Sequence, residues 1–352
     1  MLSTRVENPV YWGTIQACSP DPEYRIFYSL ENNVSAYQNA QSTPVDVLLS
    51  VYNGEKYLLE QINSLLLQTH PHIRLIVRDD GSSDNSADIL KSLRLKHPDK
   101  ITLVSDAFHL GANQSYSHLL KMSTAPYTMF CDQDDVWLPD KVTRTLNTMR
   151  SAERELGSKT AILVHTDMMV VDENLRKLDK SFFHYQNINP KKNTLNRLMV
   201  QNVITGCTMM INAKLREIVS PFPDGIIQHD WWIGLTAAAF GFIRCLREPT
   251  MKYRLHGTNQ IGPKRWNPAF ILRMAGDEFA MLPSALNRTY NQAGSFHTRF
   301  ASRLPVHISK MVYTYSQFNQ LSLTAKLIAV LKYGLFKQGI IRNIGYLLVT
   351  SS

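Results

Sequence analysis

The 352-residue sequence has few cysteines and no long apolar run. Its four cysteines lie far apart and form neither a zinc motif nor a paired-thiol redox motif, so we expect structural thiols in a reducing compartment. No run of about 18 apolar residues could span a bilayer, and no basic-then-apolar start resembles a secretion signal. We therefore expect a folded protein on the cytoplasmic side.

Several common catalytic and nucleotide-binding motifs are also missing. The sequence has no G-x-G-x-x-G after its first predicted strand, no phosphate-loop lysine motif and no G-x-S-x-G. These absences argue against a dinucleotide-binding fold and a serine hydrolase. The hydrophobic content of 44% and charged content of 19% are ordinary for a globular protein. The length suits one large catalytic domain with appendages.

Acidic residues are absent from the end of the chain, since none follows Glu278. The stretch from Leu323 to Val349 combines aliphatic and aromatic residues with cations only. Such a helix would lie in a membrane interface and be attracted by anionic lipid, whereas an ordinary helix docked on the domain is the alternative. The apolar richness favours lipid over nucleic acid. The cations that follow Glu278 are Arg288, Arg299, Arg303, Lys310, Lys326, Lys332, Lys337 and Arg342.

Short apolar runs alternate with helix-length segments from Val45 onward, which indicates βα units around a mostly parallel sheet. Before this point the periodicity is weak, and from about Pro263 the pattern is helical and basic. We expect an extension at 1–43, an α/β catalytic domain at 44–262 and a C-terminal helical, basic region at 263–352. The expected strands are 45–51, 73–77, 101–104, 127–131, 161–164, 207–211, 243–246 and 250–253, and the expected helices include 55–67, 111–122 and 230–240.

Polar turns follow three of the predicted strands at their carboxyl ends. The first contains Tyr52 and Asn53, the second contains Asp79 and Asp80, and the third begins at Asp132. Because open α/β sheets bind ligands outside the carboxyl ends of their strands, these turns predict one shared pocket. A carboxylate of the second turn could accept a hydrogen bond from a base or ribose, although turn formation alone is the alternative.

The third turn, Asp132-Gln133-Asp134-Asp135, places three carboxylates on one sharp corner. These groups would repel one another unless a cation neutralised them, and their hard oxygen atoms suit Mg²⁺ or Mn²⁺. The alternative is a solvated acidic turn that caps the following helix. That cap would be Asp135 or Asp140, and we favour Asp135.

Two later motifs carry further candidates. In His229-Asp230-Trp231-Trp232, the two tryptophans could wall a sugar site, while Asp230 could accept a hydroxyl proton or merely cap its helix. In Tyr253-Arg254-Leu255-His256-Gly257, either cation could meet a diphosphate, and His256 could also bind the metal. An isolated basic loop is the competing interpretation of the second motif.

The order and spacing of these motifs resemble the inverting family 2 glycosyltransferases over about Val45 to Gly262. The resemblance implies a GT-A fold, a nucleotide-sugar donor, Asp230 as catalytic base and a metal at Asp134. The Asp-Gln-Asp-Asp-Val-Trp variant is most similar to bacterial rhamnosyltransferases of O-antigen or capsule synthesis. The implied site comprises Ser50, Tyr52, Asn53, Asp79, Asp80, Gly111, Asn113 and Asp132 for the nucleotide; Asp134, Asp132 and His256 for the metal; and Arg254, Trp231 and Trp232 for the diphosphate or acceptor.

The same resemblance implies a reaction and a location. A sugar, for example rhamnose from dTDP-rhamnose, would pass with inversion to a lipid-linked oligosaccharide at the inner face of the plasma membrane. The Gln-x-x-Arg-Trp motif of processive synthases is absent, so we expect addition of one or a few sugars. Two alternatives remain open from sequence, namely a sugar-phosphate nucleotidyltransferase and a non-catalytic carbohydrate-binding assembly subunit.

Overall fold

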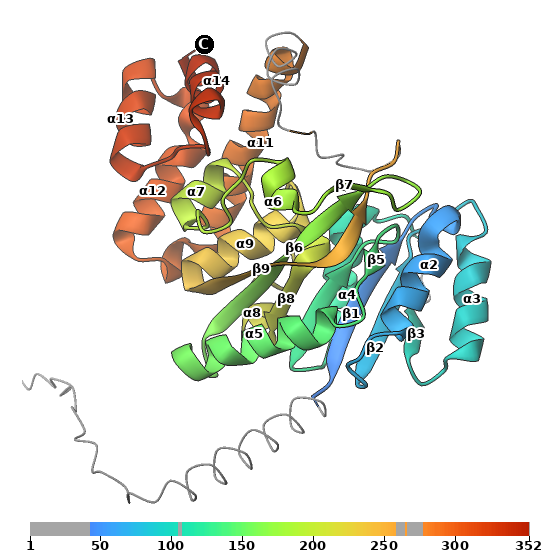
Figure 1. The fold of residues 1–352 in the computed structure, drawn as a ribbon. Helices are drawn as coiled ribbons and strands as arrows, with labels where there is room; N and C mark the ends of the chain where they lie inside the picture. Colours follow the sequence, from blue (N-terminus) through green and yellow to red (C-terminus); the bar gives the residue numbers. More distant parts are fainter. Residues whose placement is uncertain (1–42, 105–107, 258–264, 266–276, 352) are drawn as a thin grey trace, which may run out of the picture. The chain divides into compact units, whose positions relative to one another are not determined.

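The computed structural model describes residues 43–104, 108–257, 265 and 277–351. The extension expected at 1–43, except its last residue, and the boundary expected at 262–263 lie outside the described residues. Strands and helices alternate through the first half of the chain, as the apolar periodicity predicts (Figure 1). These elements are β1 (Val45–Val51), α2 (Glu55–Leu66), β2 (Ile73–Asp79), α3 (Ser86–Lys96), β3 (Ile101–Val104), α4 (Gly111–Met122), β4 (Tyr127–Cys131), β5 (Val136–Trp137) and α5 (Lys141–Leu156).

The second half of the domain has longer strands and more short helices than the sequence predicts. The two strands expected at 243–246 and 250–253 form one strand whose register with its neighbour shifts near Pro249. Proline cannot donate to a ladder and is tolerated at such an irregularity. The elements are β6 (Ala161–Val171), β7 (Lys177–Asp179), α6 (Phe182–Tyr185), α7 (Leu195–Val200), β8 (Met209–Asn212), α8 (Ala213–Val219), α9 (His229–Phe240) and β9 (Gly241–Arg254).

The described strands form one nine-stranded sheet in the order β3-β2-β1-β4-β8-β6-β9-β5, with β7 beside β6. The strands from β3 to β4 are parallel, whereas β8 is antiparallel to both of its neighbours. Alternate side chains of each strand enter different cores. On β1, Leu48 faces the core that contains α4, α8 and α9, while Val47 and Leu49 face the core that contains α2, α3 and α5. Because helices cover both faces of the sheet, we expect its ligand site at the carboxyl ends of the strands.

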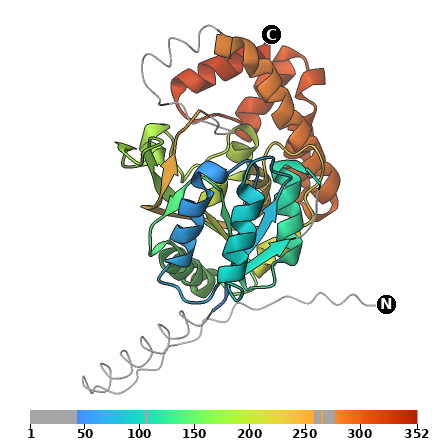
Figure 2. The same cartoon turned by 90° about the vertical axis from the view of Figure 1, so that its right-hand side faces the viewer.

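Four C-terminal helices follow and extend the first of these cores. They are α11 (Asp277–Phe300), α12 (Val306–Ser316), α13 (Leu323–Tyr333) and α14 (Ile340–Ser351). Phe296 and Phe300 of α11 pack with Trp232 of α9, at ring-centroid distances of 5.5 and 5.8 Å. Both views show the orange and red helices gathered together (Figures 1 and 2). Within the described part of the chain, none of the helices is both long and apolar enough to span a bilayer.

Candidate active site

The polar turns after β1 and β2 are joined by hydrogen bonds. The Asn53 N–H donates to Ser82 Oγ at 2.9 Å, and the Ser83 N–H donates to Asn53 Oδ1 at 2.8 Å. Asn53 holds a left-handed conformation with φ of 50°, which asparagine tolerates better than most residues. The Gln133 side chain then bonds to both backbone groups of Tyr52, donating to its oxygen at 3.0 Å and accepting from its N–H at 2.8 Å. The acidic turn is therefore fixed to the first turn, as the prediction of one shared site requires.

Asp80 is buried and fully engaged within the protein. Its carboxylate accepts the Leu110 and Gly111 N–H groups at 2.7 and 2.8 Å and forms an ion pair with the buried Arg78. Burial opposes its ionisation, but these N–H donors and the guanidinium together hold the pKa of Asp80 below its ordinary value. Gly111, with φ of 74°, thus serves to close the loop onto Asp80.

Asp79 remains partly exposed at the end of β2, and Ser50 is partly exposed near the end of the adjacent strand β1. The Asp79 carboxylate accepts from Ser82 Oγ at 2.5 Å and from Ser82 N at 3.2 Å. The ring of Tyr52, which is 48% exposed, lies 4.7 Å from the ring of His109. Carboxylate and aromatic surface thus occur together beside the turns, and His109 was not among the residues predicted from sequence.

Asp132 and Asp134 are partly buried carboxylates at the carboxyl end of β4. Burial and the neighbouring charge of Asp134 raise the pKa of Asp132 to about 6, while the Tyr116 hydroxyl donates to it at 3.1 Å. Asp134 Oδ2 lies 2.8 Å from Nε2 of His256, whose side chain is 8% exposed. Asp134 and His256, two of the three predicted metal ligands, are therefore in direct contact, and the third, Asp132, is close enough to Asp134 for the two charges to repel each other.

Asp135 does not cap a helix, which corrects the prediction from sequence. It is completely buried, and its Oδ1 accepts the Arg254 N–H at 3.1 Å, while α5 begins only at Lys141 after Asp140. Burial raises the pKa of Asp135 well above its ordinary value, with Asp134 and Asp132 adding to the rise. Capping requires a carboxylate beside the first helical N–H groups, and this side chain instead points toward β9.

Arg254 is buried and holds the acidic turn in place. Its Nε donates to the backbone oxygen of Asp134 at 2.8 Å, and its Nη1 donates to that of Glu173 at 2.7 Å. Its remaining nitrogen forms an ion pair with Glu60, and the guanidinium lies 4.5 Å from the ring centroid of Tyr57. With only 3% of the residue exposed, Arg254 supports the acidic turn, and the contact with a diphosphate expected from sequence is not favoured.

Cys207 belongs to the same neighbourhood, although sequence patterns gave no reason to place it there. One ligand atom from each of Asp132, Asp135 and Cys207 lies within 4.8 Å of the others. Burial raises the pKa of the Cys207 thiol well above its ordinary value, so it stays protonated. A buried neutral thiol is a poor ligand for Mg²⁺ or Mn²⁺, whereas the oxygen and imidazole atoms of Asp132, Asp134 and His256 fit such an ion.

Asp230 lies at the start of α9 and is 6% exposed. Its two oxygens accept the Gly206 N–H at 3.0 Å and the Asn202 amide at 3.2 Å. Burial raises the pKa of Asp230 to about 7, and the charge of Asp132 adds to the rise. This carboxylate is therefore close to half-ionised at neutral pH, and it neighbours the acidic turn.

The residues next to Asp230 fix its position. His229 packs on Tyr116 with ring centroids 4.1 Å apart, and burial lowers the pKa of His229 to about 3. The His229 N–H donates to Asn113 Oδ1 at 2.8 Å, and Asn113 Nδ2 donates to the Ile226 oxygen at 3.1 Å. Asn113, predicted as a nucleotide contact, therefore bridges α4 to the segment before Asp230.

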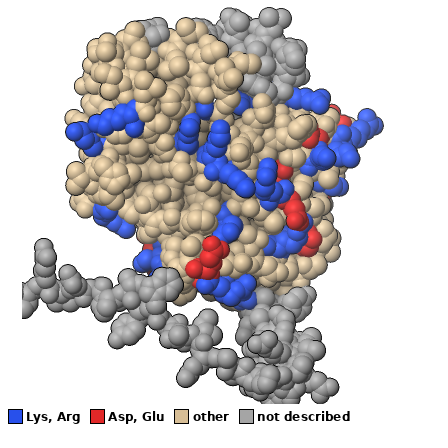
Figure 3. All heavy atoms as spheres, turned by 60° about the vertical axis from the view of Figure 1, so that its left-hand side comes forward, with Lys and Arg blue, Asp and Glu red and all other residues tan. Residues whose placement is uncertain are grey.

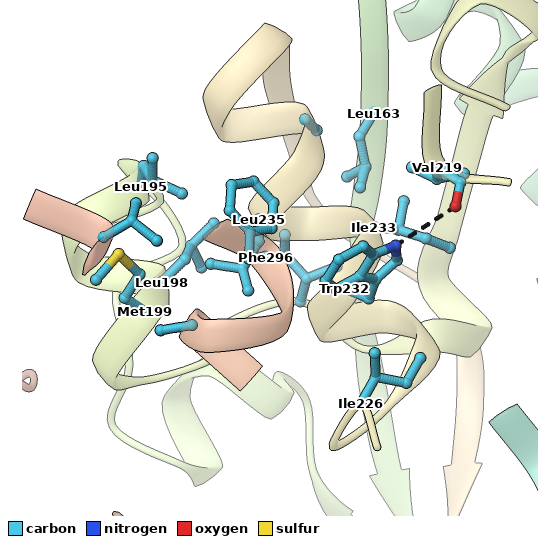
Figure 4. Packing of buried hydrophobic residues seen from close by; sticks show 14 of the residues in the cluster. Leu163, Leu195, Leu198, Met199, Val219, Ile226, Trp232, Ile233, Leu235 and Phe296 are labelled. Carbon is cyan, nitrogen blue, oxygen red and sulfur yellow. Dashed lines mark hydrogen bonds between the residues drawn. The ribbon is translucent and has the colours of Figure 1, made fainter. Parts of the chain in front are cut away.

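Trp232 does not line the site as the sequence suggested. Trp232 is completely buried among Ile233, Leu163 and Phe296, and its indole nitrogen points toward the Val219 oxygen at 3.4 Å (Figure 4). The helical periodicity explains this outcome, because adjacent residues on α9 point in different directions. Trp231 is partly buried and donates to the Leu198 oxygen at 2.5 Å, which ties α9 to α7.

With this geometry established, the chain can be compared with known proteins. Residues 46–218 match the family described as glycosyl transferase family 2. A glycosyltransferase of Nostoc is 30% identical over 223 residues, which cover 61% of this chain and 66% of that protein. The chain therefore carries a family 2 glycosyltransferase domain. The match spans just under two thirds of the Nostoc protein's length.

Further relatives of this glycosyltransferase carry more specific names. The dTDP-rhamnosyl transferase RfbG of Shigella flexneri is 26% identical, with 61% of this chain and 73% of that protein covered. TuaG of Bacillus subtilis, a glycosyltransferase assigned to teichuronic acid biosynthesis, is 29% identical, with coverage of 64% and 84%. Two crystal structures of S. aureus TarS 1–349, with UDP and with UDP-GlcNAc, have TM-scores of 0.52 at 15% and 16% identity. They cover 80% and 88% of this chain, and 73% and 91% of theirs. The α/β GT-A fold expected from sequence is confirmed.

Proposed function

We propose that this glycosyltransferase transfers a sugar with inversion from a nucleotide-sugar donor to a lipid-linked glycan. The observation that carries the proposal is Asp230, a buried carboxylate whose pKa is raised to about 7 beside the acidic turn. A general base works best when its pKa lies near the working pH, because it is then both available and strong enough to accept a proton. Relatives in cell-surface polysaccharide synthesis support the same kind of reaction.

The nucleotide would bind at the first two turns. The exposed ring of Tyr52 offers a stacking surface, and the partly exposed carboxylate of Asp79 can accept a hydrogen bond from a base N–H. Asp80 is not suited to this contact, because it is buried and its oxygens accept from Leu110, Gly111 and Arg78. Ser50 and Asn53 would border the same site on β1 and its turn.

Asp134, Asp132 and His256 would hold Mg²⁺ or Mn²⁺. The raised pKa of Asp132, caused by burial and by Asp134, shows that the two carboxylates repel each other, and a cation would relieve this repulsion. When bound, such an ion supplies positive charge to the departing nucleoside diphosphate. Arg254 keeps the turn in the conformation that presents Asp134.

The reaction that follows from these positions is a single displacement. The acceptor hydroxyl attacks the anomeric carbon of the donor sugar while its proton passes to a carboxylate oxygen of Asp230. The bond from that carbon to the diphosphate oxygen breaks, and the electron pair leaves with the diphosphate. Attack from the face opposite the leaving group inverts the configuration at the anomeric carbon.

The donor sugar proposed is rhamnose, carried as dTDP-rhamnose, since the relative RfbG bears that activity in its name. The test incubates the full chain with Mn²⁺ and a panel of nucleotide sugars, and follows thermal stability and nucleoside diphosphate release. A bound donor raises the apparent stability of the folded state. We expect stabilisation and product release with dTDP-rhamnose, both lost on chelation. Activity with a different donor would overturn the rhamnosyl assignment, and pyrophosphate release from sugar phosphate and nucleoside triphosphate would indicate a nucleotidyltransferase instead.

A further inference from the structure

Two C-terminal helices carry aliphatic side chains that the core does not cover. Leu331 of α13 is 73% exposed and Ile340 of α14 is 80% exposed. Their exposed neighbours recur at intervals of three and four residues, so they form one face of each helix. An exposed aliphatic face of this kind usually marks an interaction site. The full set on α13 is Leu323, Leu327, Ile328 and Leu331, and that on α14 is Ile340, Ile341, Ile344 and Leu348.

The charge of this region identifies the kind of partner. No acidic residue follows Glu278, and Lys332 of α13 is exposed beside the aliphatic face. Figure 3, which turns the C-terminal helices toward the viewer, shows isolated blue groups and no red over its upper left part. Aliphatic groups combined with cations fit an anionic bilayer, where both contribute to binding. In a second copy of this chain, α13 and α14 would offer Lys332 no acidic partner, which disfavours self-association through this face.

The connector between α13 and α14 is bonded to the loop that precedes the catalytic base. Gln338 donates from Nε2 to the Asn189 oxygen at 3.1 Å and accepts from the Asn189 N–H at 2.6 Å. Its own N–H donates to Gln201 Oε1 at 2.8 Å, and Arg342 donates to the Asn187 oxygen at 2.9 Å. Gln338 is 5% exposed, so these bonds are shielded from water.

The segment to which Gln338 bonds also contacts Asp230. Asn202 follows Gln201 in sequence, and its amide donates to Asp230 Oδ1 at 3.2 Å. On the same segment, the Leu198 oxygen accepts from the indole of Trp231. Unbroken contacts therefore run from the exposed helices through Gln338 to the side of the site where an acceptor must approach Asp230.

We infer that α13 and α14 form a docking face for an anionic lipid bilayer, and that Gln338 couples docking to the segment 186–202, which contains α7 and bonds to Asp230 through Asn202. The first part is independent of the enzyme's reaction. The second part rests on the proposed function, because it treats Asp230 as the group that meets the acceptor. Docking would hold the acceptor side of the site next to the membrane in which a lipid-linked glycan resides.

The docking face is tested by sedimentation of the full chain with phosphatidylglycerol-containing vesicles and with phosphatidylcholine vesicles. We expect binding to the first only, weakened by salt, and reduced more than about tenfold in Leu331→Glu/Ile344→Glu. The matched control is Leu95→Glu, an 82% exposed leucine on α3, which lies across the sheet from α13 in Figure 1. Equal binding of the double variant and wild type, or concentration-dependent dimerisation lost in the double variant, would overturn the assignment to lipid.

The coupling is tested by hydrogen exchange of the full chain with and without the same anionic vesicles. We expect vesicles to slow exchange in residues 186–202 of the wild type about severalfold, but not in Gln338→Ala. Asn343→Ala is the control, because the Asn343 amide bonds only to the Lys337 and Gly339 oxygens of the connector itself. Unchanged exchange of this loop in the wild type would refute the coupling. Vesicle binding without sugar transfer would instead leave the docking face standing while the proposed function fails.

Discussion

Two buried aspartates of this site, Asp80 and Asp230, have pKa values shifted in opposite directions. Asp80 and Asp230 are 2% and 6% exposed, so burial alone does not distinguish them. Asp80 faces the Arg78 guanidinium, which favours its charged form, whereas Asp230 has only neutral donors and the like charge of Asp132. The pKa of Asp80 is therefore lowered and that of Asp230 is raised to about 7. The first is a fixed structural anion and the second can exchange a proton at neutral pH.

The raised pKa of Asp230 predicts the pH dependence of transfer. Because the base must be ionised, kcat/KM should fall about tenfold per unit as pH decreases below about 7. His229 does not titrate in this range, since its pKa is about 3, so the limb belongs to Asp230 and its neighbour Asp132. Asn202→Ala removes a donor to the charged form and should move the limb to higher pH. A base with an ordinary carboxyl pKa, near about 4, would give a flat pH profile between about 5 and 8, and such a profile would contradict this assignment.

Asp230 should also lower the free energy of unfolding at neutral and alkaline pH. A carboxyl group whose folded-state pKa lies above its unfolded value of 3.8 destabilises the fold above that value, fully so once pH exceeds about 7. Asp230→Asn should therefore raise the free energy of unfolding at pH 8 by roughly 2–4 kcal/mol and leave it nearly unchanged at pH 4. Urea unfolding at the two pH values measures the difference. Equal destabilisation at both would mean that Asp230 supports the fold.

Sequence patterns predicted the acidic residues but not the groups that donate hydrogen bonds to Asp230. Asp230 and Asp134 belong to local motifs with recognisable spacing, and both lie in the site. Asn202 and Gly206 belong to no motif, yet both donate hydrogen bonds to Asp230. For Gly206 the reason appears only in three dimensions, because a Cβ there would lie 2.6 Å from Nε2 of His229. Contacts between distant segments carry no local periodicity.

At the scale of elements, the end of β9 positions the acidic turn. Sequence predicted two strands in this segment, at 243–246 and 250–253, but pairing with β6 continues from one to the other through Pro249. The longer strand brings Arg254 to the turn after β4. There its N–H donates to the Asp135 carboxylate and its Nε donates to the Asp134 backbone oxygen. Tertiary pairing thus overrides the local signal.

Arg254 should consequently affect stability and metal binding together. Arg254→Lys loses the forked donors and should cost roughly 2–3 kcal/mol, with weaker Mn²⁺ binding because the Asp134 backbone loosens. Thermal unfolding and Mn²⁺ titration measure the two effects. Lys56→Ala is the control, since its pair with Glu173 is exposed and should contribute little. Unchanged Mn²⁺ affinity in Arg254→Lys would show that the turn holds without this clamp.

Trp232 belongs to the element α9 and not to the acceptor site. Trp232→Ala should destabilise the protein by roughly 3–5 kcal/mol, because it empties a core position between α9 and α11. Donor affinity and KM of the folded fraction should stay near wild type. Denaturant unfolding and kinetics below the unfolding transition separate the two quantities. A large rise in acceptor KM with unchanged stability would restore the role that the sequence suggested.

At the scale of the whole molecule, the C-terminal helices and the catalytic domain share one hydrophobic core. Phe296, Phe300 and Tyr315 join the cluster that contains Trp232, so these helices fold with the domain. Composition predicted that this region is helical and basic, and the described elements confirm helices from 277 onward. It did not predict the bonds from Gln338 to the loop before Asp230, because amide contacts of this kind leave no pattern in a sequence.

The central claim is that Asp230 accepts the proton of the acceptor hydroxyl. Its most direct measurement compares donor binding with sugar transfer for Asp230→Asn, using Asp224→Asn, an exposed aspartate before α9, as control. We expect donor affinity close to wild type and a transfer rate lower by about 10²–10⁴, with the control unaffected. If Asp230→Asn transferred sugar at nearly the wild-type rate while binding the donor normally, another group would have to be the base.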